Sequence, residues 1–301
     1  MGRVIWRLIQ TVLAVLFLGA VALLVWSLIG PPPPPTAIPG VLPRLTPAAC
    51  ASDQAFAPAA TQNAASLTGA AWSAFGRAES GWEIYAPLTA HEIGSGCPPD
   101  TPAFARALAT WQGAHHLAGD GVMTEDTLKQ LRTLWLGRRP FVAATAHGVC
   151  PPPPPPEQLA WARPEEGFQG KPVQLRLAGL AAYRSLVAAA RAEAPELEKN
   201  PRLLTIFSGF RDPVADQQAC DTTVTCGTIT RARCSAHRTG LAVDLYLGSM
   251  PGSAPELSDD GNRLFQSRST AYRWMVANAA RFGFVNYPFE PWHWEWTGEA
   301  P

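Results

Sequence analysis

Two uninterrupted runs of proline, Pro31 to Pro35 and Pro151 to Pro156, constrain this chain of 301 residues more than any other feature. Proline has no backbone N–H and a fixed φ, so neither run can lie inside a helix or a sheet. Each run is expected to form a stiff, extended spacer of about 3 Å per residue. We therefore predict three segments, at residues 1–30, 50–148 and 161–301, joined by proline-rich linkers at 31–49 and 149–160.

The first segment is predicted to anchor the chain in a membrane. No side chain from Leu8 to Gly30 is charged, and a run of this length can cross the roughly 30 Å hydrocarbon layer as a helix. Arg3 and Arg7 precede the run and no basic residue follows until Arg44, which favours a cytoplasmic N-terminus. The alternative is a cleaved signal peptide, whose apolar region is normally shorter. We favour a single-pass anchor in the inner (cytoplasmic) membrane through residues 8–30, with both later segments outside the cytoplasm.

Charge and cysteine content narrow the environment and the partners. Basic and acidic side chains balance at 24 each, so no global field would attract nucleic acid, and we expect no such partner. Six cysteines in an exported chain are expected to form disulfides. Three of them lie on each side of the second proline run, so one bridge should cross it. Among the possible pairings we favour Cys50 with Cys97, and Cys150 with a cysteine of the C-terminal segment.

The segment at 50–148 is predicted to be a small helical domain. Apolar residues recur at helical spacing from Phe104 to Gln112, and after a Gly-Asp-Gly turn Thr124 can cap a second helix over Glu125 to Leu136. With Trp111-Gln112, Asp120-Gly121-Val122-Met123 and Thr127-Leu128, this pattern resembles the small peptidoglycan-binding domain often fused to wall hydrolases. A generic helical spacer is the alternative. The segment's histidines lack metal-ligand spacing and are interpreted as surface residues: His91, His115, His116 and His147.

The segment at 161–301 is predicted to be an α+β domain, with a small antiparallel sheet and flanking helices. Hydrophobic periodicity indicates these elements: a helix over Leu175 to Ala194, strands over Leu203 to Phe207 and Leu241 to Leu247, a helix from Thr270 to Gly283 and a last strand over Trp292 to Trp296. Alternation along the second strand takes Asp244 off its apolar face. The small helical domain and one transmembrane helix precede this domain.

Candidate metal ligands concentrate in this last segment. His237 and Asp244 flank the glycine turn at Gly240 in Ser235-Ala-His-Arg-Thr-Gly-Leu-Ala-Val-Asp244, and a turn of this kind can bring the two side chains together. Hydrolytic zinc commonly keeps three protein ligands and one open position. The only other histidine after the second proline run is His293. Spacing alone leaves open whether these residues bind a metal or only form hydrogen bonds.

The order of the motifs resembles the VanY-type D-alanyl-D-alanine carboxypeptidase family of zinc peptidases. The resemblance covers roughly residues 173 to 298 and rests on the segment from Ser235 to Asp244, on Glu290-Pro-Trp-His293 and on Ser208-Gly-Phe-Arg211. It implies Zn²⁺ as the cofactor, with His237, Asp244 and His293 as its ligands and Glu290 as the general base. It also implies that Arg211 binds substrate and stabilises oxyanion charge, and that Ser235 helps to hold the substrate.

Some assignments within this resemblance stay open. The spacing after Arg211 departs from the family pattern, so either Gln217 or Gln218, or neither, is the substrate-binding glutamine; we take Gln217 and Trp292 as further substrate-binding candidates. On a straight strand Glu295 rather than Glu290 shares a face with His293, and Glu290 reaches the metal only if Pro291 bends the chain. We interpret Glu295 as a carboxylate that faces water or pairs with an arginine.

The function implied is a zinc-dependent carboxypeptidase that removes the terminal D-alanine of peptidoglycan stem peptides. Three alternatives remain: an L,D-carboxypeptidase, a wall endopeptidase of the same fold, and a non-catalytic peptidoglycan-binding protein with a structural zinc. An endopeptidase of the lysostaphin kind would be expected to end in His-x-His, and here Glu295 occupies the second position.

Overall fold

The computed structural model describes residues 46–224, 226–227 and 233–301. The predicted membrane anchor at 8–30 lies outside these residues. Within the described part of the chain, no helix is both long and apolar enough to cross a membrane. Residues Gly40–Pro301 form one compact unit by their contacts, so the two predicted domains that flank the second proline run belong to the same unit.

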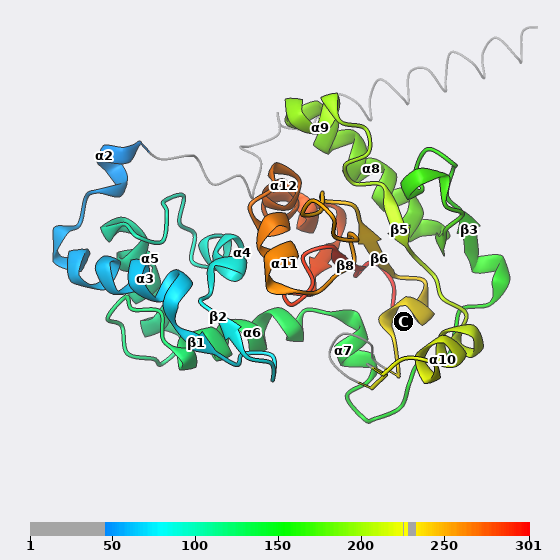
Figure 1. Cartoon of the computed structure of the whole chain (residues 1–301), viewed down its shortest axis with the longest axis horizontal. Helices are drawn as coiled ribbons and strands as arrows, with labels where there is room; N and C mark the ends of the chain where they lie inside the picture. Colours follow the sequence, from blue (N-terminus) through cyan, green and yellow to red (C-terminus); the bar gives the residue numbers. More distant parts are fainter. Residues whose placement is uncertain (1–45, 225, 228–232) are drawn as a thin grey trace, which may run out of the picture. The chain divides into compact units, whose positions relative to one another are not determined.

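The N-terminal part of this unit is mainly helical (Figure 1). Both predicted helices are confirmed, as α5 (Pro102–Ala114) and α6 (Glu125–Gly137), and the Thr124 hydroxyl caps α6 by accepting from Thr127 N at 3.2 Å. The other elements are α2 (Pro47–Cys50), η1 (Gln54–Phe56), α3 (Ala57–Gly69), β1 (Ala71–Trp72), β2 (Glu79–Ser80), η2 (Glu83–Tyr85), α4 (Ala86–Glu92) and α7 (Pro140–Ala144).

Two buried amides hold the turn between α5 and α6. Gln112 Oε1 accepts from Gly121 N at 2.9 Å, and Asn63 Oδ1 accepts from Met123 N at 2.7 Å. Gly121 has a φ of +77°, and a Cβ there would lie 2.4 Å from the Ala105 carbonyl oxygen. Only glycine fits this close approach, which explains the second glycine of the Gly-Asp-Gly sequence. The link to peptidoglycan binding stays a prediction.

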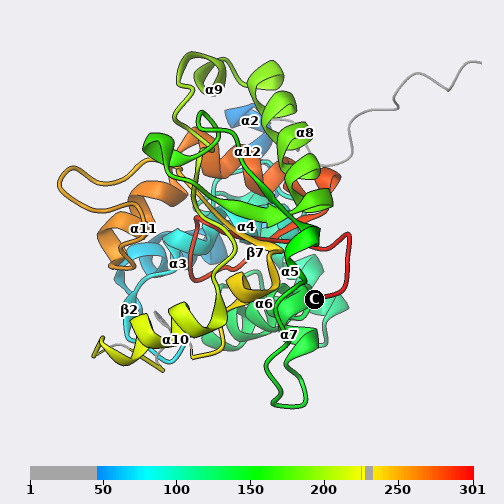
Figure 2. The ribbon, with the colours of Figure 1, turned by 90° about the vertical axis from the view of Figure 1, so that its right-hand side faces the viewer.

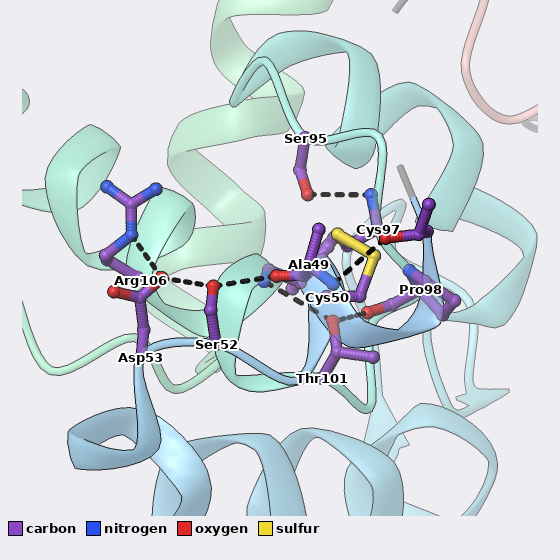
Figure 3. Close-up of a disulfide and its surroundings, with 11 residues drawn as sticks. Ala49, Cys50, Ser52, Asp53, Ser95, Cys97, Pro98, Thr101 and Arg106 are labelled. Atoms are coloured by element: carbon purple, nitrogen blue, oxygen red, sulfur yellow. Dashed lines mark hydrogen bonds and ion pairs between the residues drawn. A yellow bond between two sulfur atoms is a disulfide. The ribbon is translucent and has the colours of Figure 1, made fainter. Parts of the chain in front are cut away.

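All six cysteines form disulfides: Cys50–Cys97, Cys150–Cys234 and Cys220–Cys226. The first is the expected bridge within the N-terminal part, where Figure 3 shows it between α2 and the loop before α5. The second crosses the second proline run, as predicted. It joins Cys150 to the residue directly before Ser235, and thus ties the end of the middle segment to one edge of the candidate site.

The second proline run is extended but does not stand clear of the protein. Pro155 has φ −61° and ψ 146°, the extended conformation expected of polyproline. Pro151 and Pro154 are buried. The run therefore lies against the compact unit along part of its length, and the predicted domain boundaries stay a prediction.

The C-terminal part is α+β, as predicted, around a four-stranded antiparallel sheet with strand order β5-β6-β8-β7. These strands are β5 (Ile206–Ser208), β6 (Ala242–Leu245), β7 (Phe284–Asn286) and β8 (His293–Trp296), and a separate pair joins β3 (Leu159–Trp161) to β4 (Gln174–Arg176). The helices are α8 (Leu177–Glu193), α9 (Pro195–Lys199), α10 (Pro213–Asp221), α11 (Asp260–Ser267) and α12 (Thr270–Asn278), with short turns η3 (Pro156–Gln158), η4 (Phe168–Gly170), η5 (Ala236–Thr239) and η6 (Ala279–Phe282).

Helices cover both sides of the four-stranded sheet. In the two views α8 and α12 lie above it, and α7 and α10 lie below it (Figures 1 and 2). All four residues of β6 are buried, so the face that carries Asp244 is covered as fully as the apolar face. A half-exposed sheet would have left this aspartate in water.

Three predicted boundaries were wrong. The helix predicted from Leu175 begins at Leu177, because Gln174–Arg176 pairs with β3 as a strand. The strand predicted from Leu203 begins at Ile206, because Leu204 adopts a left-handed conformation with φ 67° in the preceding turn. The strand predicted over Leu241 to Leu247 is the shorter β6. The helix from Thr270 does end at Gly283, although its last turn, η6, is a 3₁₀ helix.

Candidate metal centre

Local turns place three candidate ligands together. His237 lies in η5, whose first turn is capped by Ser235 Oγ accepting from His237 N at 3.3 Å. Gly240 ends η5 with a φ of +69° and lets the chain enter β6, which carries Asp244. Asp244 pairs in register with His293, the first residue of β8. A turn and two adjacent strands thus bring the predicted ligands into one buried place.

The donor atoms converge closely. His237 Nε2 lies 3.1 Å from Asp244 Oδ2, and His293 Nδ1 lies 2.9 Å from Asp244 Oδ1. One ligand atom from each of the three residues lies within 4.8 Å of the others. Two imidazoles and one carboxylate, with an open position, are a donor set that suits hydrolytic zinc. The residues therefore fit the metal that the sequence resemblance implied.

The second nitrogen of each imidazole has its own partner. His237 Nδ1 lies 2.7 Å from the Gly209 carbonyl oxygen, and His293 Nε2 lies 3.4 Å from Glu295 Oε1. Both partners are acceptors that can take an N–H from that nitrogen, and the opposite nitrogen of each ring faces the Asp244 carboxylate. Partners of this kind orient metal-binding histidines and raise their basicity.

The charges around the three residues shift their pKa values in opposite directions. Burial, together with the nearby charge of Arg211, lowers the pKa of His237 to about 4. Burial would also lower the pKa of His293, but hydrogen bonds to Asp244 and Glu295 outweigh it and raise that pKa to about 9. The two histidines outweigh burial at Asp244 and lower its pKa. Asp244 is therefore an anion that is ready to bind a cation.

Glu290 lies beside these residues, on the loop that leads into β8. Its Oε2 is 4.0 Å from His293 Nδ1, and its side chain keeps 17% exposure. The loop turns tightly, since Glu290 N donates to the Tyr287 carbonyl and His293 N to the Glu290 carbonyl, both at 2.9 Å. This is the bend at Pro291 on which the assignment of Glu290 depended. Burial, aided by the charge of Asp244, raises the pKa of Glu290 to about 7, which suits a group that accepts and returns a proton near neutrality.

Arg211 borders the same cluster from the end of β5. Its Nη2 lies 3.3 Å from Asp244 Oδ2, and Ser208 Oγ accepts from its Nε and Nη2 at 3.1 and 2.9 Å. Asp216, which sequence reasoning did not single out, lies 3.7 Å from Nη1. The guanidinium keeps 31% exposure, so it is fixed in place and still accessible to an anionic ligand.

The other predicted substrate contacts have partners within the protein. Trp292 is only 2% exposed and packs into the hydrophobic core, and its contact with substrate stays a prediction. Gln217 donates to Asp221 Oδ1 at 2.7 Å, within α10, and its contact with substrate stays a prediction. Ser235 is half-buried and serves as the cap of η5.

Glu295 has a more specific environment than the sequence indicated. It does pair with an arginine, Arg139, whose Nε donates to Oε1 at 2.7 Å, but its side chain is buried rather than facing water. Arg139 lies 156 positions earlier in the chain. No local pattern could have identified it, because its partner is set only by the tertiary fold.

Comparison with known proteins agrees with the sequence resemblance. Residues 173–299 match the family model of VanY, described as D-alanyl-D-alanine carboxypeptidase. No curated protein matches the chain. A solved structure with some likeness is a zinc(II) complex of a mutant vancomycin-resistance D,D-pentapeptidase VanY from a VanB-type resistance cassette. It is 22% identical, with 49% of this chain and 83% of that chain covered and a TM-score of 0.30, a likeness from which nothing further is concluded.

Proposed function

We propose, from the match of residues 173–299 to the VanY family model, that this chain is a zinc-dependent D-alanyl-D-alanine carboxypeptidase. The observation that carries the proposal is the buried convergence of His237, Asp244 and His293, with Glu290 Oε2 only 4.0 Å from His293 Nδ1. A metal-binding set with an adjacent carboxylic acid is what amide hydrolysis at neutral pH requires.

The residues divide the chemistry between them. When bound, zinc supplies Lewis acidity toward the scissile carbonyl and lowers the pKa of water. Glu290 takes a proton from the attacking water and returns it to the departing amine of the terminal D-alanine. One carboxyl can fill both roles because its pKa, about 7, lies near the operating pH.

Arg211 is suited to the anionic parts of the substrate. A stem peptide that ends in D-alanine carries a carboxylate, and the developing oxyanion adds a second negative centre. The guanidinium stays charged and presents forked donors to either group. Ser208 and Asp216 hold it from one side, so it can bind with little loss of side-chain freedom.

Two features argue against a purely structural metal. A structural zinc site is usually closed by four protein ligands, whereas among the residues that the structure describes the group consists of His237, Asp244 and His293. A structural site also needs no base, and Glu290 lies beside the ligands. The substrate is proposed to be the peptidoglycan stem peptide, reached from an anchor in the inner membrane formed by residues 8–30.

A substrate panel tests the proposal. The purified, zinc-loaded full chain is incubated with a stem pentapeptide, its D-lactate-terminated analogue, a tetrapeptide and a cross-linked dimer, and products are followed by mass. We expect loss of one alanine from the pentapeptide, with the tetrapeptide and dimer intact. Cleavage of only the tetrapeptide would indicate an L,D-carboxypeptidase, and cleavage of the dimer an endopeptidase. Binding of zinc without any release would support the non-catalytic alternative.

A further inference from the structure

A buried ion pair links the middle segment of the chain to the candidate metal centre. Arg139 occupies the N-cap position of α7, and its guanidinium Nη2 lies 2.5 Å from Glu295 Oε1. Phe141 N donates to the other oxygen, Oε2, at 3.1 Å. The two charged side chains are 10% and 2% exposed. Glu295 thus has both oxygens engaged by one turn of α7.

Burial of this pair is hard to explain by stability alone. Removing two charges from water has a cost that their attraction often fails to offset, so apolar residues of similar volume frequently serve as well. The position of Glu295 suggests another purpose. It lies two residues after His293 on β8, on the same face of the sheet, and its Oε1 is 3.4 Å from His293 Nε2.

We propose that Arg139 is a positioning residue for the metal centre: by holding Glu295, it fixes the orientation of the His293 ring. The His293 Nε2 then points at a carboxylate whose two oxygens are both held by hydrogen bonds, and Nδ1 faces Asp244 Oδ1 at 2.9 Å. Partners of this kind strengthen metal binding by a histidine although they never touch the metal.

The same segment also contacts the loop that carries Glu290. The Arg139 guanidinium lies 4.1 Å from the centre of the Tyr287 ring, and that ring packs edge-on against His293 with centroids 5.9 Å apart. At the other side of the loop, Arg263 Nε donates to the Phe289 carbonyl at 2.7 Å, directly before Glu290.

Arg263 is in turn held by the N-terminal part of the unit. Its side chain is fully buried, pairs with Glu79 and donates to the Tyr85 hydroxyl at 2.7 Å. Residues of β2 and η2 therefore hold the segment from Tyr287 to Glu295 through Arg263, and residues at the start of α7 hold it through direct contacts. The segment predicted to bind the wall is, in this account, also part of the scaffold of the catalytic centre.

The inference rests on the proposed function for the identity of the ligands, so its test uses metal binding as well as activity. Arg139→Met is compared with Arg268→Met in the full chain. Arg268 is a matched control, since it forms a two-pronged ion pair with Glu83 across the same boundary, at 2.7 Å for each contact, and its side chain is 55% exposed. The zinc dissociation constant is measured by chelator competition, and the visible spectrum of the Co²⁺-loaded protein reports ligand geometry.

We expect Arg139→Met to weaken zinc binding roughly 10- to 100-fold, to alter the Co²⁺ spectrum and to lower kcat more than it raises KM. Arg268→Met should change none of these. Arg139→Lys, which keeps a charge opposite Glu295, should recover part of the affinity. If Arg139→Met does not fold, the zinc affinities of Arg139→Lys and Arg268→Lys are compared instead. Weaker zinc binding is then expected only in Arg139→Lys.

Folded Arg139 variants that bind zinc as the wild type does would overturn the inference, as would a wild-type chain that binds no metal. A wild-type chain that binds zinc but releases no D-alanine would refute only the proposed function, because the contrast in zinc affinity between the Arg139 and Arg268 variants would still stand.

Discussion

Asp244 and His293 are directly opposite each other on adjacent antiparallel strands, with Oδ1 and Nδ1 only 2.9 Å apart, although 49 positions separate them in the sequence. Because the register of β6 against β8 fixes this distance, the site is built into the sheet rather than into a mobile loop. The carboxylate also lies 3.1 Å from His237 Nε2. Asp244 is therefore the residue through which both histidines are brought together.

Asp244→Asn should abolish tight zinc binding. The amide keeps the shape of the side chain but removes the negative charge that favours a cation between two imidazoles. Substituting a residue that only supports a ligand typically weakens metal binding roughly 10- to 100-fold. Because Asp244 is itself a proposed ligand, its substitution should weaken zinc binding by more than this. Equilibrium competition with a chromogenic chelator measures this directly. Retention of wild-type affinity would mean that Asp244 is not a ligand.

Removal of the metal from the wild type should lower the midpoint of thermal unfolding. A ligand that binds only the folded state stabilises it by about 2.7 kcal/mol when its concentration is about 100 times its dissociation constant. Differential scanning calorimetry with and without chelator checks this. The Asp244→Asn variant is the control and should show no such difference.

Arg211→Lys tests whether forked donors are needed. Lysine keeps the charge but cannot contact two oxygens with fixed geometry. We expect kcat/KM for the pentapeptide to fall about 100-fold or more, as for loss of an oxyanion donor, while zinc affinity is kept. Arg191→Lys, on the exposed side of α8, is the matched control. Equal activity of the two variants would remove Arg211 from the substrate site.

The Glu166 carboxylate should make stability depend on acid pH. Burial would raise its pKa, but hydrogen bonds from Arg184 and Arg163 outweigh it and lower the pKa from 4.5 to about 2. A carboxyl whose pKa is lower in the folded than in the unfolded state stabilises the fold at pH values above the unfolded-state pKa. This stabilisation is lost as the pH falls from about 4.5 to about 2. The contribution is on the order of 2–3 kcal/mol at neutral pH.

Glu166→Gln should therefore lower the free energy of unfolding at pH 7 and flatten its decline below pH 5, as followed by urea titration across pH. Glu165→Gln is the control, because this neighbouring side chain is 68% exposed. The same steep decline in Glu166→Gln as in the wild type would assign the acid sensitivity to other groups.

The disulfide from Cys150 to Cys234 should stabilise the fold more than the short one from Cys220 to Cys226. The first bridge spans 84 residues and the second 6. Closing a longer loop restricts the unfolded chain more, and the entropic model gives about 4.5 kcal/mol for the longer loop. Paired serine substitutions, compared by thermal unfolding, test the order. Loss of the short disulfide lowering the midpoint of thermal unfolding as much as loss of the long one would contradict this order.

The ligands of the candidate site could be predicted because they belong to short motifs. His237 and Asp244 flank one turn, and His293 follows Glu290 by three positions, so the order of these motifs carried the family resemblance that implied the ligands. The position of Glu290 depended on a bend at Pro291 that the sequence allowed but did not require. The resemblance to a family, rather than strand periodicity, selected Glu290 over Glu295.

What the sequence could not indicate was set by long-range packing. Arg139 finds Glu295 across 156 positions, and an arginine before a proline carries no sign of such a partner. Leu204 looked like a strand residue by its side chain, but its backbone is left-handed in the folded chain. Trp292 lies within a functional motif and packs into the core, and membership of the motif does not indicate that packing.

The most direct test of the account compares the zinc-loaded wild type with Glu290→Gln on a stem pentapeptide, with products measured by mass and bound zinc measured in the same samples. We predict that the wild type releases one D-alanine per peptide. The variant should retain zinc but lose a factor of about 100 to 10,000 in kcat, because glutamine cannot take the proton. Equal rates, or release of D-alanine by a wild-type chain that holds no zinc, would contradict the assignment of Glu290 and of the metal centre.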